Sequence, residues 1–378
     1  MVALSWIVLS VLVALSGYLV TPDSTPYANT QHLELSAKKP GTRVQFLRIR
    51  KNADIAPVSV WKKMLRGEQS PYFEVPVEGY YFQEGTVVAE KYTGFEDFEG
   101  MEIAYPMADV LFDMDSAIVK DNRVTVFYRN GEIGNYSIRE LEERIENHHI
   151  KERVFRLGTD RFGRDMLSQV IIGARISLSV GFIAISIALL LGVLMGSLAG
   201  FFRGRTDNFI VWLINVVWSI PTLLLVIAIT FALGKGFWQI FIAVGLTMWV
   251  DVARVVRGQI ISLRENEYIE AARALGLPGF RIIRRHLLPN IIGPVVVISA
   301  ANFASAILIE AGLSFLGIGV QPPMPSWGNM IRENYGYIIL DKAFLALIPG
   351  ICIMLLVMAF MITGNGLRDA LDKSAANY

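Results

Sequence analysis

Long apolar runs alternate with short polar segments along most of this chain. A helix needs about 20 apolar residues to cross a bilayer. Six stretches meet this requirement, and they cover residues 2–20, 176–200, 209–232, 237–256, 290–313 and 343–364. The pattern predicts an α-helical membrane protein with six transmembrane helices. The first stretch lacks a basic start and a clear cleavage site, which favours a retained helix over a signal peptide.

A long polar stretch, residues 21–155, separates the first two apolar runs. Residues 42–50 alternate between apolar and polar side chains, which predicts a strand. Segment 123–138 is typical of a hairpin, because Asn130-Gly131 suits a tight turn with positive φ. Ser137 then begins a helix in a capping box that Glu140 completes. We therefore expect residues 21–155 to form an α+β domain inserted after the first helix.

Composition and charge agree with this division. The 378 residues are 53% hydrophobic and only 18% charged, with a mean hydropathy of +0.45 and a net charge of +1. Residues 21–155 hold 17 basic and 22 acidic side chains, whereas the remainder holds 18 and 12. If the N-terminus is inside, the inner segments hold ten Lys and Arg against three in the short outer loops. The positive-inside rule then predicts that both termini are cytoplasmic and that residues 21–155 face outward.

Catalytic and metal-binding patterns are missing from the sequence. It contains no phosphate loop of the Gly-x-x-x-x-Gly-Lys-Ser/Thr type, no HExxH zinc motif and no recognisable Ser/His/Asp set. His148-His149 point in different directions on a helix, and we interpret both as surface residues. Cys352 is the only cysteine, so no intrachain disulfide can form. These observations predict a chain that is not an enzyme by itself and binds no metal.

A polar, basic segment between two apolar runs carries the strongest motif. Residues 267–276 predict a short helix ending at Gly276, followed by a Pro278-Gly279 turn and a second basic helix ending before Pro289. Alanines at 271, 272 and 274 leave part of the first helix without bulky side chains. Another backbone could approach closely there. On residue chemistry alone, a solvated amphipathic loop is the alternative interpretation.

The segment resembles the Glu-Ala-Ala loop of ABC importer permeases. Glu270-Ala271-Ala272, Gly276 and Leu288-Pro289 fit the family pattern, and His286 stands where Ile is usual. A longer stretch, Gly158 to Asp165, resembles the C-type dipeptide/oligopeptide permease subunits, and the likeness runs from about Leu157 to Asp372. On bare physics, Asp160 or Asp165 would cap free backbone N–H groups there.

This resemblance implies a fold, partners and roles. It implies a type I ABC importer permease core over residues 156–378, with a cytoplasmic coupling loop at 257–289 that docks on an ATPase subunit. The implied partners are a second permease subunit, two ATP-binding subunits and an extracytoplasmic solute-binding protein. ATP and magnesium would bind to the ATPase subunits. Coupling would rest on the residues of the motif, which are Glu270, Ala271, Ala272, Ala274, Gly276, Leu288 and Pro289.

Four residues are candidates for the translocation path or outer gate. Pro221 can kink the third span, and Glu310 is an ionisable group near the end of the fifth span. Gln321 and Trp327 lie in a long loop that also resembles the C-type permeases. Asp251 and Arg254 are three residues apart, and we interpret them as a local ion pair.

Other functions fit parts of the sequence. A membrane-anchored receptor with a ligand-binding outer domain would explain the large insert but not the Glu-Ala-Ala loop. Within the importer interpretation, the cargo is expected to be di- or oligopeptides, with nickel chelates or oligosaccharides as alternatives. We expect the insert to dock with the partner permease or the binding protein, and a passive spacer is the alternative.

Overall fold

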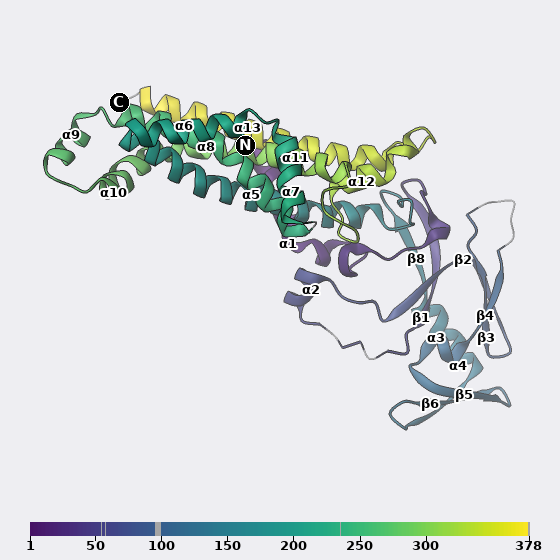
Figure 1. Cartoon of the computed structure of the whole chain (residues 1–378). Coiled ribbons are helices and arrows are strands. Elements are labelled where there is room, and N and C mark those ends of the chain that lie inside the picture. Colours follow the sequence, from purple (N-terminus) through teal and green to yellow (C-terminus); the bar gives the residue numbers. More distant parts are fainter. Residues whose placement is uncertain (54, 57, 95–99, 235, 377–378) are drawn as a thin grey trace. The chain divides into compact units, whose positions relative to one another are not determined.

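The chain forms two compact units in the computed structural model, which describes residues 1–53, 55–56, 58–94, 100–234 and 236–376. The helical unit comprises Met1–Leu15, Ile172–Ile338 and the chain from Ala346 onward. The strand unit comprises Ser16–Ile171 and Ile339–Leu345. Figure 1 shows the helices of the first unit and the strands of the second.

Long apolar helices make up most of the helical unit. Five of the described helices are long and apolar enough to cross a membrane, and a bent pair makes a sixth crossing if it counts as one span. This confirms the expected helical membrane fold with a strand-containing insert. Three of the helices, α1, α5 and α13, begin or end in the strand unit. The helices are α1 (Val2–Val20), α5 (Met166–Phe202), α6 (Gly204–Trp218), α7 (Thr222–Leu233), α8 (Phe237–Leu263), α9 (Glu267–Ala274), α10 (Gly279–Ile282), α11 (Ile292–Phe315), α12 (Trp327–Asn334) and α13 (Phe344–Ala376).

The predicted third span, 209–232, is not one helix. It is divided into α6 and α7, which meet at an angle of 93°. Pro221 caps the start of α7 with φ −53° and ψ 126°, outside the helical region. Its ring blocks the preceding helical turn and it has no N–H to donate, so α6 ends before it. The expected kink at Pro221 is therefore a full break.

Helix α8 lies at the centre of the helical unit and is its most buried span. Glycines of α5 lie against it. A Cβ on Gly192 would come within 2.5 Å of the Val252 Cβ, and one on Gly196 within 2.5 Å of the Ala253 carbonyl oxygen. Small residues allow membrane helices to approach backbone to backbone, and this contact depends on them.

The second basic helix does not end before Pro289. Helix α10 continues through a π-helical turn (Ile283–Leu287) and a 3-10 turn (Leu288–Ile291) into α11. Together they form one helical stretch from Gly279 to Phe315. Pro289 is tolerated because it lies in the first turn of the 3-10 segment, and the irregular turns relieve the clash of its ring. The second helix of the loop is therefore directly continuous with a membrane span.

The strand unit is built on two antiparallel sheets. The larger has the order β4-β3-β2-β1-β8 and the smaller the order β5-β6-β7. Short helices accompany them, namely α2 (Val60–Arg66), α3 (Met107–Leu111) and α4 (Ile138–Arg144). The strands are β1 (Thr42–Arg50), β2 (Tyr72–Gln83), β3 (Thr86–Lys91), β4 (Glu102–Pro106), β5 (Met114–Lys120), β6 (Arg123–Tyr128), β7 (Ile133–Ser137) and β8 (Ile150–Phe155).

Strand β1 is buried on both faces, which explains its imperfect alternation. Val44 and Phe46 pack with Leu35 and Phe155 in one apolar cluster. Leu47 points the other way, into a larger cluster with residues of α3 and α4. The predicted hairpin is confirmed in β6 and β7, and the Ser137 hydroxyl accepts from the Glu140 N–H at 3.2 Å as an N-cap. The strand unit thus has its own core.

His149 is buried, so its interpretation as a surface residue is wrong. Its Nδ1 lies 2.6 Å from the carbonyl oxygen of Arg48, and its ring meets Tyr72 edge-on. The preceding helix ends in a π-turn, which directs His149 toward β1. Burial lowers the pKa of its imidazole below the ordinary value.

Candidate coupling loop and translocation residues

Helix α9 has a well-defined end. Gly276 adopts φ +72°, a conformation that glycine adopts without strain. The Leu277 N–H donates to the Ala272 carbonyl at 3.2 Å, and the Gly276 N–H donates to the Arg273 carbonyl at 2.9 Å. This is a Schellman motif, which satisfies the last carbonyls of the helix and turns the chain toward α10.

The motif residues divide between two sides of α9. Ile269 and Ala272 are buried and pack into the core of the helical unit. Glu270, Ala271, Ala274 and Gly276 are exposed. Ile269 and Ala272 therefore fix α9 to the bundle. The opposite, exposed face of α9 carries the acidic side chain of Glu270 beside small residues. Sequence reasoning treated the three alanines alike, whereas the structure separates Ala272 from the other two.

Phe201, at the end of α5, anchors the loop from beneath. The Arg273 guanidinium lies 5.0 Å from the centre of its ring, and Arg264 Nη1 donates to its carbonyl oxygen at 2.8 Å. A Cβ on Gly279 would come within 2.7 Å of the Phe201 ring. These contacts tie both short helices to α5.

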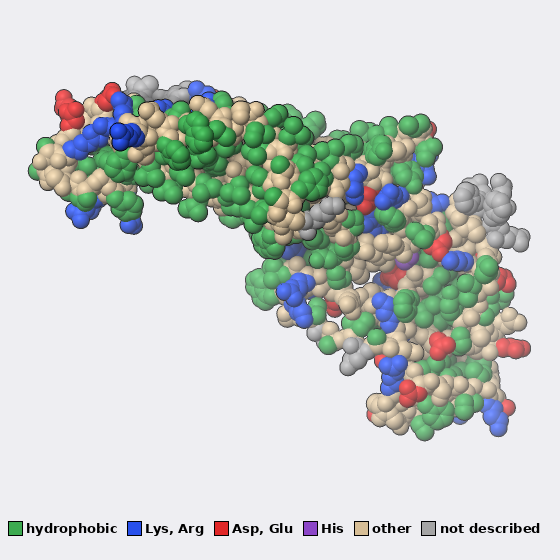
Figure 2. All heavy atoms as spheres, in the orientation of Figure 1, with side chains coloured by type: hydrophobic (Ala, Val, Ile, Leu, Met, Phe, Trp, Pro, Cys, Tyr) green, Lys and Arg blue, Asp and Glu red, His purple; other side chains and the backbone are tan. Residues whose placement is uncertain are grey.

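The exposed part of the loop is amphipathic. Leu275 and Phe280 are 80% and 72% exposed, although both are large apolar side chains. Arg281, Arg284 and Arg285 are exposed on the second helix. Figure 2 shows acidic and basic side chains gathered at the α9–α10 end of the bundle, whereas the adjoining helices are mainly hydrophobic on the surface. An apolar patch with a charged rim is typical of a protein-binding surface.

Leu288 and Pro289 lie apart from the exposed face of α9. Leu288 is half-buried against the core of the helical unit, and Pro289 is exposed at the 3-10 turn. They mark the place where the loop joins the membrane span rather than the surface that the loop presents.

Glu310 is completely buried near the other end of α11. Its Oε1 accepts from the Ser314 hydroxyl at 2.6 Å. Ser177 of α5 and Ser326 face the same carboxyl, but among the described residues no side chain reaches hydrogen-bond geometry with Oε2. The polar cluster therefore joins α5, α11 and the loop before α12.

Gln321 and Trp327 belong to this same end of the helical unit. Ser326 Oγ donates to Ser314 Oγ at 3.2 Å and also caps α12 by accepting from the Asn329 N–H at 3.2 Å. Trp327 is buried against Gly173, where a Cβ would come within 3.0 Å of the indole. Gln321 is exposed, and its amide donates to the Gly319 carbonyl at 2.8 Å. The structure thus brings together three of the four path candidates.

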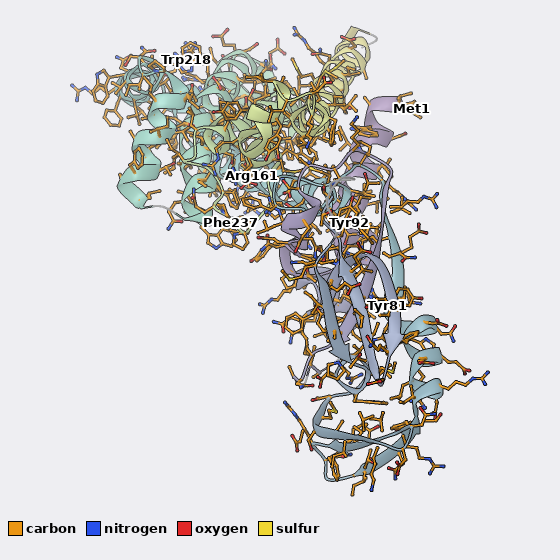
Figure 3. All side chains as sticks on the ribbon, turned by 90° about the vertical axis from the view of Figure 1, so that its right-hand side faces the viewer. Met1, Tyr81, Tyr92, Arg161, Trp218 and Phe237 are labelled. Atoms are coloured by element: carbon orange, nitrogen blue, oxygen red, sulfur yellow. The ribbon has the colours of Figure 1, made fainter. Side chains whose placement is uncertain are left out.

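Pro221 belongs to a second polar site, at the break between α6 and α7. The expected pairing of Asp251 with Arg254 is replaced by contacts to Trp218, the last residue of α6, which is labelled in Figure 3. The Trp218 indole N–H donates to Asp251 Oδ1 at 3.3 Å, and the Arg254 guanidinium carbon lies 3.4 Å from the centre of the indole ring. Sequence reasoning missed Trp218, although an aromatic residue just before Ser-Ile-Pro was a visible signal.

A cavity of about 180 Å³ opens beside this break. Asp251, Thr222 and Thr247 supply polar atoms to its wall, and Ile309 of α11 supplies an apolar part. Ile309 directly precedes Glu310 on α11. Asp251 lines this cavity, whereas Pro221 lies at the break beside it, at the start of α7.

Residues 158–165 form a turn that is held by buried charges. Asp160 Oδ1 accepts from the N–H groups of Phe162 and Arg164, both at 2.9 Å. Its Oδ2 lies 2.6 Å from both Nε and Nη2 of Arg164. Burial raises the pKa of the Asp160 carboxyl, and Arg164 opposes that effect. Asp165 accepts from the Ser168 N–H at 2.8 Å, so both aspartates cap backbone groups as predicted.

Comparison with known proteins identifies the family. Residues 188–377 match the model described as "Binding-protein-dependent transport system inner membrane component". The chain belongs to this family. It is a multi-pass membrane component of a transport system, which confirms the resemblance deduced from the Glu-Ala-Ala loop.

Two curated relatives agree with this assignment, and one solved structure is also similar. The chain is 42% identical over 215 residues to the "Dipeptide transport system permease protein DppC" of Alkalihalophilus pseudofirmus, covering 57% of this chain and 70% of that protein. It is 40% identical over 216 residues to the "Oligopeptide transport system permease protein OppC" of Bacillus subtilis, with coverage of 57% and 70%. A solved inward-facing MetNI methionine ABC transporter aligns with a TM-score of 0.45 and 20% identity, over 54% of this chain and 97% of that one.

Proposed function

We propose that this chain is a permease subunit of an ATP-driven importer for di- or oligopeptides. Membership of the binding-protein-dependent family supports the importer class. The peptide cargo is supported by the names of the relatives at about 40% identity. The chain has no phosphate loop of its own, so ATP and magnesium are assigned to two partner ATPase subunits. A second permease subunit and a solute-binding protein complete the proposed assembly.

The exposed face of α9 is the observation that carries the coupling role. Glu270, Ala271, Ala274 and Gly276 are open to a partner, while Ile269 and Ala272 fix the helix to the bundle. An ATPase subunit that binds this face would move the loop when the pair of ATPase subunits binds ATP and closes. We place the loop and both termini in the cytoplasm and residues 21–155 outside, in accordance with the positive-inside rule.

A continuous helix gives this movement a route across the membrane. The stretch Gly279–Phe315 has 37 residues, and at 1.5 Å per residue it is roughly 55 Å long. It begins at the coupling loop and ends five residues beyond Glu310. Displacement of the loop is therefore passed along this helical stretch to the Glu310 cluster and the α12 loop, and this end is the proposed outer gate.

A pull-down of the detergent-solubilised chain tests the proposal. Wild type is expected to capture ATPase subunits and a second permease. Glu270→Arg combined with Ala274→Trp puts the wrong charge and a large side chain on the docking face, so the ATPases are lost while the second permease remains. Glu265→Arg is the matched control, because Glu265 is also exposed but precedes α9. If wild type captures no ATPase, the coupling role is wrong.

A further inference from the structure

Helix α2 in the strand unit is amphipathic but does not bury its apolar face. At 100° per residue, Val60, Trp61, Met64 and Leu65 fall within one continuous arc of about 140°. The three basic residues, Lys62, Lys63 and Arg66, fill the opposite arc. Every residue of the helix is therefore apolar or basic, and the two classes are fully separated.

Three of the four residues of the apolar arc of α2 are exposed, and Met64 is half-buried. Trp61 is 73% exposed, Val60 67% and Leu65 60%, and none of the seven residues of the helix is buried. The helix is nevertheless well formed. The Ser59 hydroxyl accepts from the Lys62 N–H at its start, and Gly67 ends it at φ +75°. Large apolar side chains gathered on an exposed face mark a surface that contacts a membrane or another protein.

Contacts at the end of α2 place it beside the ends of two membrane spans. The Glu68 N–H donates to the Ser24 carbonyl at 2.9 Å, and Lys63 Nζ pairs with Glu68 at 2.6 Å. A Cβ on Gly67 would lie 2.7 Å from the same Ser24 oxygen. Ser24 is four residues beyond Val20, the end of α1, so it lies within about 14 Å of that end.

The start of α5 lies at the same place. The Asp23 N–H donates to Ser168 Oγ at 3.0 Å, and Ser168 is in the first turn of α5. Residues 22–24 therefore join the end of one span, the start of another and the end of α2. All of these residues belong to the strand unit.

We propose that α2 lies flat in the headgroup region of the bilayer, as an interfacial anchor of the strand unit. The end of α1 is the depth at which headgroups begin, because its 19 residues span roughly 28 Å, about the thickness of the hydrocarbon core. Trp61 suits this depth, since indole rings concentrate at membrane interfaces. Lys62, Lys63 and Arg66 face the phosphates of anionic lipids, while Trp61 and Leu65 enter the acyl region.

The charge pattern favours lipid over a protein partner as the occupant of this face. Basic residues flank an apolar face on a short helix beside a membrane span, which is the arrangement that binds anionic bilayer surfaces. Figure 2 shows hydrophobic and basic side chains side by side at the position of α2 in Figure 1.

Spin-label accessibility on the full chain tests the anchor. Cys352→Ala removes the only cysteine. Single cysteines are then placed at Trp61 and Leu65 on the apolar arc, and at Ile133 of β7, which is 61% exposed, as the reference. The chain is reconstituted in nanodiscs of phosphatidylethanolamine and phosphatidylglycerol. Labels at 61 and 65 are expected to collide several-fold more with dissolved oxygen, relative to a water-soluble nickel complex, than the label at 133.

Two outcomes overturn the proposal. Labels at 61 and 65 that match the reference show that α2 is in water. Labels shielded from both oxygen and the nickel complex show that protein covers the face. A second variant tests the basic arc: Lys62→Glu with Arg66→Glu should return the label at Leu65 toward the reference ratio, and an unchanged ratio contradicts contact with anionic headgroups. Lys63 is left intact, because it pairs with Glu68.

Discussion

Replacing Asp160 by Asn is predicted to loosen the turn before α5. Asn keeps the size of the side chain but removes its charge, so the buried Arg164 loses the carboxylate of residue 160 while it keeps its contact to Asn29 Oδ1 at 3.3 Å. The side chains of Arg164 and Asp160 are only 7% and 2% exposed. Removing one partner of a buried ion pair costs about 3–5 kcal/mol, because the remaining charge has lost its water and its partner.

Hydrogen exchange on the solubilised chain can measure this loss locally. The N–H groups of Phe162 and Arg164 both donate to Asp160, and the Asp160 N–H donates to the Arg164 carbonyl at 3.0 Å. Since each 1.4 kcal/mol is a factor of ten in an equilibrium constant, protection of the peptide that carries these amides should fall by roughly 100- to 3,000-fold. Asp109→Asn is the matched control, because it makes the same change at an exposed position of α3.

A double variant tests the physical reason. Asp160→Asn with Arg164→Met removes both charges, and apolar replacement of a buried pair is often neutral. Protection should therefore recover most of its wild-type value. The reasoning is refuted if the single variant exchanges like wild type, or if the double variant is no better protected than the single one.

Three further predictions follow from the packing and the buried polar groups. Gly196→Ala should destabilise the solubilised chain by about 1–3 kcal/mol through overpacking against Ala253. Gly366→Ala is the control, because Gly366 has open space around it and the substitution should not destabilise the chain. Equal thermal midpoints for the two variants would contradict the α5–α8 contact. Glu310→Gln should keep the hydrogen bond from the Ser314 hydroxyl and preserve assembly. Glu310→Ala leaves the Ser314 hydroxyl without its acceptor, which should cost about 1–3 kcal/mol of stability. Thermal unfolding and uptake assays on both variants measure these effects. Burial, assisted by Arg153, lowers the pKa of His32. The contribution of His32 to the stability of the strand unit is therefore complete above the ordinary pKa of about 6.5 and is lost as the pH falls below it, because the unfolded chain then binds more protons. His32→Phe should weaken this pH dependence in hydrogen exchange, and an unchanged profile would exclude His32 as its source.

The order of elements could be predicted from the sequence because it depends on local patterns. Apolar length alone locates the spans, since a bilayer imposes nearly the same requirement on every crossing. Two-residue alternation and Asn130-Gly131 locate β1 and the β6–β7 hairpin, because strand and turn preferences act over a few residues. Glycine at 276 and the alanines beside it locate the coupling loop for the same reason.

Long-range packing decided the rest. Only the fold shows that Ala272 faces inward while Ala271 and Ala274 face outward, because that depends on where Phe201 lies beneath the loop. Asp251 and Arg254 are spaced to pair, but Trp218 comes from another helix and contacts both side chains, donating to Asp251 and stacking under Arg254. Glu310 is buried because serines of α5 and of the loop before α12 close around it. Residues distant in sequence supply those contacts, and a local pattern carries no information about them.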